Sequence, residues 1–404
     1  MLHLVANLFV FPVLLALCCV GLRHGLSWSS LVNATLFPAL MLASVAVHEA
    51  GHALAARAVG LTVLRIELGM GRRVWRGRLG RTDVVLNAFP VLGLTFCGAA
   101  SERALRTRFW FLVAGGPAIT AALVVLLWPP TSSPWQVVLP LEAFAHRIAP
   151  RELLVFFNLW LLAFNLLPVP LLVRNLGMVN DGTRLLTIPF SRQDEARDLL
   201  DSAVLLDATE RVERRDFAGA RERLDEALAR RPASVHLRNV LGTVQLAEGE
   251  HAEARTTFLG LLRDVSPKTL SFWFIRNNVA WTDFLLRREE LRAEADEHSA
   301  AAYARLKNVP AIVGTRGAVL VWLDRSAEAV PLLERAFVAT GAPPNRANVA
   351  CTLVLGFTRL GDRERAARWL ARAEENDPHC ALLSEARAAL APPLTAPTGP
   401  AAIA

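Results

Sequence analysis

One helix-length segment combines strong hydrophobicity with ionisable side chains. Residues 31–59 are long and apolar enough to cross a bilayer, which takes about 20 residues of α-helix. Three ionisable residues, His48, Glu49 and His52, nevertheless stand together near the end of this segment. Burying such groups in a membrane helix is costly, so they are retained where they serve a function. The cluster therefore predicts a functional site at membrane depth.

The spacing of the two histidines is typical of a metal-binding helix. His48 and His52 are four residues apart, so their imidazoles lie on one helical face and converge on one point, where neutral ring nitrogens hold Zn²⁺. Glu49 is placed to accept a proton from a nearby water. The alternative is a hydrogen-bonded histidine pair with Glu49 reaching towards water, but three ionisable groups in one turn would be costly there without a metal. We therefore predict one Zn²⁺ per chain.

A zinc enzyme needs a third protein ligand and an open coordination position. Asp181 follows the apolar, Pro-interrupted segment 153–170, and a broken helix lets a carboxylate turn into a cavity instead of into lipid. The other carboxylates of the apolar half lie in loops or at segment ends: Glu67, Asp83, Glu102, Glu142 and Glu152. An Asp-Gly turn that caps residues 183–188 is the alternative interpretation. We predict Asp181 as the third ligand.

Hydropathy and charge together predict a multi-pass membrane topology. Residues 60–108 carry nine Arg against three acidic residues, so the positive-inside bias places this loop in the cytoplasm. Counting crossings from there puts the N-terminus and everything after residue 170 in the cytoplasm as well. Arginine as the dominant basic residue and a compact plan of four helices favour a bacterial inner membrane. The four segments expected to cross are 1–22, 31–59, 109–128 and 153–170.

The basic character of the chain does not indicate a nucleic-acid partner. The formal net charge is +7, and residues 1–190 account for it with 15 Arg, no Lys and 7 acidic residues. These arginines flank apolar segments, and no basic helix is interleaved with aromatic residues. We expect the lipid bilayer and proteins, not nucleic acid, as partners. The cysteines show neither CxxC spacing nor a disulfide framework and are expected as free thiols: Cys18, Cys19, Cys97, Cys351 and Cys380.

The basic loop contains a stretch that does not have a helical pattern. Short β-favouring runs at Val63–Leu68 and Thr82–Leu86 are separated by glycines, which predicts a small β-hairpin region over residues 63–98. Non-helical backbone near membrane depth is tolerated where protein covers it or where it faces water. We therefore expect the hairpin at the cytoplasmic mouth of the membrane domain.

Taken in order, these motifs resemble the site-2 protease family of intramembrane zinc metalloproteases. The matches run from about residue 31 to residue 186 and comprise His48-Glu49-Ala50-Gly51-His52, a following β-hairpin region, Ala114-Gly115-Gly116-Pro117, Asn165-Leu166-Leu167-Pro168-Val169-Pro170 and Asp181-Gly182. Two departures stand out. Thr120 occupies a position where the family usually has Asn, and residues 171–180 lengthen the spacing from proline to aspartate.

The resemblance implies a membrane-embedded zinc endopeptidase that cuts membrane-anchored proteins in or near their spanning segments. His48, His52 and Asp181 would hold the zinc, and Glu49 would be the general base that later passes its proton to the leaving amine. Asn165, together with Thr120, would bind substrate or the oxyanion. A helix cap before Pro168 is an equally open interpretation of Asn165. A substrate segment must unwind to be cut, and the hairpin offers an edge for it to pair with.

The second half of the chain changes to amphipathic helices with an internal period. Asp216-Phe217-Ala218-Gly219-Ala220-Arg221 matches Glu250-His251-Ala252-Glu253-Ala254-Arg255 at a shift of 34 residues. This pattern resembles tetratricopeptide repeats, with about five helix pairs over 203–390 after a linker at 191–202. Stacked pairs form a surface for a cytoplasmic protein or peptide, although a packing module without a ligand is the alternative. The Pro- and Ala-rich tail, 391–404, is expected to be disordered.

The expected fold class is mostly α. A polytopic membrane helix bundle with a small β-hairpin region (1–190) precedes a cytoplasmic α-solenoid. A different zinc protease family would take its third ligand from a motif such as Glu290–Asp296, but that motif lies in repeat register on a solvated helix. A second function class is a catalytically silent receptor or scaffold of the same fold that acts through its repeats.

Overall fold

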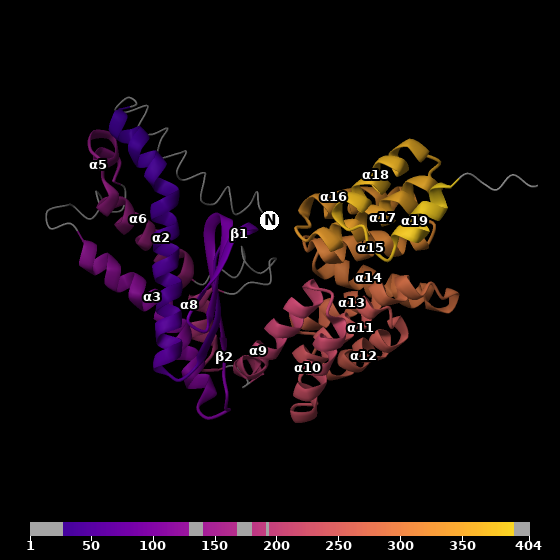
Figure 1. Ribbon diagram of the computed structural model, residues 1–404, viewed down its shortest axis with the longest axis horizontal. Helices are drawn as coiled ribbons and strands as arrows, with labels where there is room; N and C mark the ends of the chain where they lie inside the picture. The colour runs from indigo at the N-terminus through magenta and orange to yellow at the C-terminus, as the bar shows by residue number, and fades with distance from the viewer. Residues whose placement is uncertain (1–26, 129–139, 168–179, 191–193, 392–404) are drawn as a thin grey trace, which may run out of the picture. The chain divides into compact units, whose positions relative to one another are not determined.

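The structure is a computed structural model that describes residues 27–128, 140–167, 180–190 and 194–391. The chain forms two compact units, Met1–Val240 and Leu241–Ala404 (Figure 1). The described part is mostly helical with one two-stranded sheet, which confirms the mostly α fold class. The expected helix at 1–22, the prolines at 168 and 170, Cys18 and Cys19, and the tail from residue 392 lie outside the described residues.

The first unit contains two helices with the length and hydropathy of membrane spans. These are α2 (Trp28–Ala58) and α3 (Leu105–Leu127), and α2 with its 31 residues is about 46 Å long. The shorter apolar helix α6 (Pro150–Leu166) has 17 residues. The remaining described helices of this unit are α5 (Leu141–His146), α8 (Asp181–Thr187), α9 (Asp194–Glu213) and α10 (Phe217–Arg230).

Helices α2 and α3 cross with their backbones in contact. A methyl group at Gly51 would lie 2.4 Å from the carbonyl oxygen of Gly115, and a methyl group at Gly115 would lie 2.4 Å from that of Gly51. Any larger residue at either position would push the two helices apart. Small residues at helix crossings allow the close packing that drives association in lipid, where burial of apolar surface contributes little.

The residues between these helices form a bent antiparallel hairpin. Strand β1 (Thr62–Leu79) pairs with β2 (Thr82–Gly98), and residues 65–68 have partners in two stretches of β2, around 83–86 and 93–96. Gly69 and Gly71, with φ of +82° and +91°, lie where β1 bends. The hairpin therefore presents a compact sheet alongside α2 in place of a single long ribbon (Figure 1).

A hydrophobic cluster joins the C-terminal end of α2 to its neighbours. Ala56 of α2 is fully buried, and Val63 and Cys97 from the hairpin pack beside it. The same cluster includes side chains from α3, from the end of α8 and from α9: Leu105, Phe109, Leu112, Val113, Ile188, Ala196 and Leu199. Helix α9 begins inside the segment 191–202 that is expected to be a linker, and it packs here because Ala196 and Leu199 are apolar.

The helices that follow have the periodicity expected of tetratricopeptide repeats. Helix α11 (Val235–Glu248) spans the boundary between the two units, and α12 to α19 build the second unit. Ala220 and Ala254, which the 34-residue shift aligns, are fully buried, and so are three alanines of later helices: Ala295, Ala329 and Ala366. The second-unit helices are α12 (His251–Asp264), α13 (Leu270–Leu286), α14 (Arg292–Arg305), α15 (Pro310–Trp322), α16 (Ser326–Ala339), α17 (Pro343–Arg359), α18 (Arg363–Asn376) and α19 (Leu383–Leu390).

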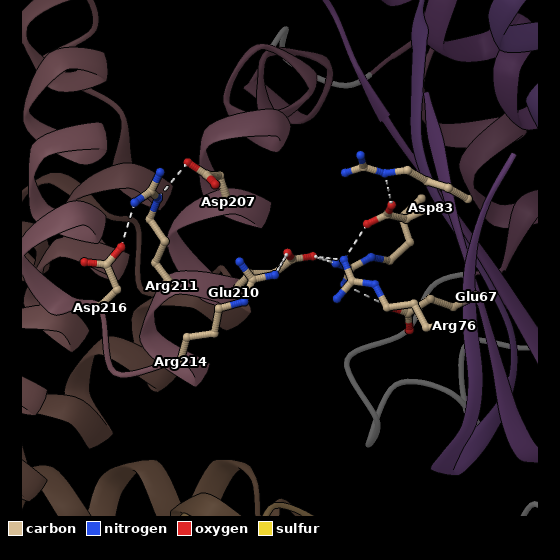
Figure 2. A network of polar contacts seen from close by, with 10 residues as sticks. Glu67, Arg76, Asp83, Asp207, Glu210, Arg211, Arg214 and Asp216 are labelled. Atoms are coloured by element: carbon tan, nitrogen blue, oxygen red, sulfur yellow. Dashed lines mark hydrogen bonds and ion pairs between the residues drawn. The ribbon is translucent and has the colours of Figure 1, made fainter. Parts of the chain in front are cut away.

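Helix α9 is also bound to the hairpin by charge. Glu210 of α9 forms ion pairs with Arg65 and Arg76 of β1, the latter with 2.9 Å between Arg76 Nη2 and Glu210 Oε1. Arg76 also pairs with Asp83 of β2 at 2.5 Å, and Figure 2 shows Glu210 between Arg76 and Arg214. The Arg65 and Glu210 side chains are only 13% and 17% exposed, so this contact is less screened by water than a surface ion pair.

We expect Glu210→Gln to loosen α9 from the hairpin. The change removes the negative charge opposite two partly buried guanidinium groups and should destabilise the docked helix by about 1–3 kcal/mol. Hydrogen exchange of the detergent-solubilised protein should then be faster in α9 and β1. The control is Glu213→Gln, at an exposed position of the same helix. Unchanged exchange in both elements would show that Glu210 does not hold α9.

Candidate metal centre

Helix α2 presents both predicted histidines on one buried face. His48 and His52 are 4% and 8% exposed, and their Nε2 atoms lie 3.2 Å apart. One turn of helix separates the residues, which is why the two rings converge. A carboxylate oxygen of Glu49 completes a group whose potential ligand atoms all lie within 4.8 Å of one another.

Asp181, at the start of α8, lies beside the ring nitrogens of both histidines. Its Oδ2 lies 3.1 Å from Nε2 of His48 and 3.4 Å from Nε2 of His52. The residues on either side explain its placement. Asn180 caps α8 by accepting from the Thr183 N–H and donates to the carbonyl oxygens of Phe164 and Leu167 at the end of α6.

Glycine after the aspartate allows this close approach. A methyl group at Gly182 would lie 2.2 Å from the carbonyl oxygen of Leu166, so α8 can begin against the end of α6 because residue 182 has no side chain. Asn180 and Gly182 thus place Asp181 beside the histidines despite the long sequence between Pro168 and the aspartate. The Asn-Asp-Gly triplet was visible in the sequence, but the contacts that Asn180 makes were not.

The donor set fits a tetrahedral zinc ion. Ligand distances of about 2.0–2.1 Å from zinc place neighbouring donor atoms about 3.3 Å apart in a tetrahedron. The three separations among His48 Nε2, His52 Nε2 and Asp181 Oδ2 are 3.1, 3.2 and 3.4 Å. Two imidazoles and a carboxylate are also ligands that zinc accepts in catalytic sites. These residues could therefore hold zinc with little rearrangement.

The second nitrogen of each histidine ring has its own partner. His48 Nδ1 lies 2.9 Å from Oγ1 of Thr120, whose hydroxyl lies 2.9 Å from the carbonyl oxygen of Gly116. Because the Thr120 hydroxyl donates to that carbonyl, Nδ1–H of His48 is the donor to Thr120. His52 Nδ1 lies 2.9 Å from the carbonyl oxygen of Leu112 and donates to it. Both rings then have Nε2 free to bind a metal, as such outer partners usually ensure.

The backbone of α3 forms one wall of the centre. A methyl group at Gly116 would lie 2.3 Å from Nε2 of His52 and 2.8 Å from Nε2 of His48. A side chain here would fill the space where the ligand atoms meet. Glycine at position 116, directly before Pro117, is thus required by the approach of α3 to the two histidines.

Two neighbours of the centre had no distinct signal in the sequence. Thr95 of β2 lies with its Oγ1 2.6 Å from Oε2 of Glu49, and a methyl group at Gly93 would lie 2.4 Å from Oε1 of the same carboxylate. The hairpin was predicted, but its register against α2 was not, and only that register brings these residues to Glu49.

The two residues predicted to bind substrate or the oxyanion, Thr120 and Asn165, make different contacts. Thr120 is fully buried and bonds to His48, as described above. Asn165 donates to the carbonyl oxygen of Leu161 one turn earlier in α6. Glu294, from the alternative motif Glu290–Asp296, belongs to the second unit, where it pairs with Arg255 and His298.

Two parts of the chain match the sequence profiles of known protein families. Residues 36–133, which include the two histidines, Glu49, Gly116 and Thr120, match the sequence profile of peptidase family M50. Residues 211–266 match a tetratricopeptide repeat profile. The chain carries a peptidase family M50 domain followed by tetratricopeptide repeats. The resemblance to the site-2 protease family, drawn from the sequence motifs, is thereby confirmed.

The chain is similar in part of its length to proteins named zinc metalloproteases. The chain is 40% identical over 73 residues to zinc metalloprotease Rip1 of Mycolicibacterium smegmatis, which is 17% of this chain and 18% of that protein. Rip1 of Mycobacterium tuberculosis is 42% identical over 65 residues, 16% of each chain. The match thus spans less than a fifth of these relatives. A thermophilic tetratricopeptide repeat protein of Thermus thermophilus matches 46% of this chain and 97% of its own, with 17% identity and a TM-score of 0.38.

We expect Thr120→Val to weaken metal binding without unfolding the protein. The substitution keeps the shape of the side chain but removes the acceptor that fixes the His48 ring, and loss of such an outer partner costs about 10–100-fold in metal affinity. Chelator competition measures the affinity. Thr282→Val is the matched control, because Thr282 is also a buried helical threonine bonded to the carbonyl four residues earlier. Equal zinc affinity in the two variants would contradict the proposed role of Thr120.

Proposed function

We propose that this protein is an intramembrane zinc endopeptidase that hydrolyses peptide bonds in or near the membrane-spanning segments of membrane-anchored proteins. The observation that carries the proposal is the triangle of His48 Nε2, His52 Nε2 and Asp181 Oδ2, with a carboxylate of Glu49 beside it. The M50 match and the two helices with the properties of membrane spans support the same conclusion.

The residues of the chain divide the chemistry between them. His48, His52 and Asp181 would hold one zinc ion and leave one position of a tetrahedron open. Zinc, when bound, supplies a Lewis acid that polarises the scissile carbonyl and makes water nucleophilic near neutral pH. Glu49 accepts a proton from the attacking water and then donates it to the leaving amine. We also propose that Asn165 contributes to substrate binding.

The hairpin is suited to hold an extended substrate segment. Residues 93–98 pair with 62–68 on one side, and among the residues that the structure describes they have no strand partner on the other. An unwound segment could add to that edge by main-chain hydrogen bonds. Because Thr95 in this stretch touches Glu49, a peptide paired there would run past the general base.

We also propose that the repeats recruit the substrate or a regulator. Tetratricopeptide arrays commonly bind proteins or peptides along stacked helices. In the topology inferred from the arginine-rich loop, they lie in the cytoplasm, which we take to be that of a bacterial cell with the protein in its inner membrane.

The test combines zinc content with cleavage of a single-span reporter by detergent-purified protein. We expect about one zinc per chain in the wild type and in Glu49→Gln, and loss of the metal in His48→Ala and Asp181→Ala. Glu49→Gln should lower kcat by about 10²–10⁴-fold, because the glutamine side chain cannot accept the proton from water.

Two controls separate this ligand set from its alternatives. Glu294→Ala should leave zinc content unchanged, because Glu294 bonds to Arg255 within the repeats. His379→Ala, which removes an exposed histidine of the repeats, should also leave zinc content unchanged. Loss of zinc in Glu294→Ala would overturn the ligand set. Absence of zinc from the wild type, or cleavage indifferent to Glu49, would favour the catalytically silent receptor instead.

A further inference from the structure

Helix α2 does not by itself orient the side chain of Glu49. Successive residues of an α-helix are about 100° apart around its axis, so Glu49 leaves the helix in a different direction from His48. A carboxylate on a free side chain would sample several rotamers, and only some of them face the ring nitrogens. A group outside α2 must therefore select the productive one.

Strand β2 supplies such a group in Thr95. The hydroxyl oxygen of Thr95 lies 2.6 Å from Oε2 of Glu49, within the range of a hydrogen bond to a charged oxygen. An ionised carboxylate only accepts, so Thr95 is the donor. Glu49 is 4% exposed, which leaves little water to compete for its oxygens.

Gly93 closes the other side of the same carboxylate. Residues 93 and 95 are two apart on a strand and face the same side of the sheet, here towards α2. A methyl group at Gly93 would lie 2.4 Å from both Cγ and Oε1 of Glu49. The backbone of Gly93 is not in the left-handed region, so glycine is needed here for space and not for its φ angle.

We propose that Thr95 is a positioning residue for Glu49, with Gly93 as the wall against which the carboxylate is held. Thr95 acts through Glu49 and does not touch the metal ligands or the reacting atoms. The inference rests on the proposed function, because it assigns a role to the hairpin in the same reaction. It adds that the strand beside the site orients the general base as well as offering an edge to a substrate.

The experiment compares Thr95→Val with Thr95→Ser in the detergent-purified full chain. Valine keeps the branched shape favoured in strands but has no hydroxyl, whereas serine keeps the hydroxyl. We expect Thr95→Val to lower kcat for the single-span reporter by about 10–100-fold, with KM and zinc content unchanged. Thr95→Ser should restore kcat to within a few-fold of the wild type, which a purely structural role would not produce.

Matched variants on the same strand guard against a general loss of packing. Thr82→Val removes another buried hydroxyl of β2, one that bonds to the carbonyl oxygen of Val63 and not to Glu49. Gly93→Ala should lower kcat with zinc retained, because its methyl group would lie 2.4 Å from Oε1 of Glu49.

The outcomes distinguish this inference from the proposed function. If Glu49→Gln abolishes cleavage while Thr95→Val lowers kcat no more than Thr82→Val does, the positioning role is wrong and the protease assignment stands. If Thr95→Ser is as impaired as Thr95→Val, the hydroxyl is not what matters and the inference falls. If Glu49→Gln still cleaves, the proposed function itself fails.

Discussion

The close crossing of α2 and α3 is the contact on which the metal centre depends. Gly51 and Gly115 bring the two backbones together, and the next residue of α3, Gly116, then lies against the histidine nitrogens. Thr120, one turn further along α3, faces the same side and bonds to His48. A bulkier residue at the crossing would therefore displace the wall of the site and the partner of a ligand together.

The two carboxylates of the centre are oriented by elements outside that crossing. Asp181 is fixed by the start of α8 against the end of α6, where Asn180 and Gly182 make the contact. Glu49 is on α2 itself, yet its carboxylate meets Thr95 of the hairpin. The lengthened sequence before Asp181 is compatible with this arrangement, because the entropic cost of closing a loop rises slowly with its length.

The arginine-rich hairpin has a structural role beside its use as a topology signal. The positive charge of the hairpin predicts which side of the membrane it faces, and in the structure Arg65 and Arg76 also pair with Glu210 of α9. The expected linker also begins a helix at Asp194 that packs on the hairpin. The composition of residues 191–202 could not predict that α9 begins there and packs on the hairpin. A short segment of mixed polar and apolar residues does not specify which part of the protein it contacts.

The sequence by itself determined the features that depend on local periodicity. Two histidines four residues apart converge on any α-helix, and alanines that recur with the repeat are buried in any stack of such helices. The sequence could single out Asp181 as a candidate ligand, but only the tertiary structure decided how distant groups meet at the centre. Thr95, Thr120 and Asp181 are 46, 72 and 133 residues from the α2 side chains that they contact. Their proximity follows from helix crossing and strand register, which arise when the whole domain packs and which no short stretch of sequence encodes.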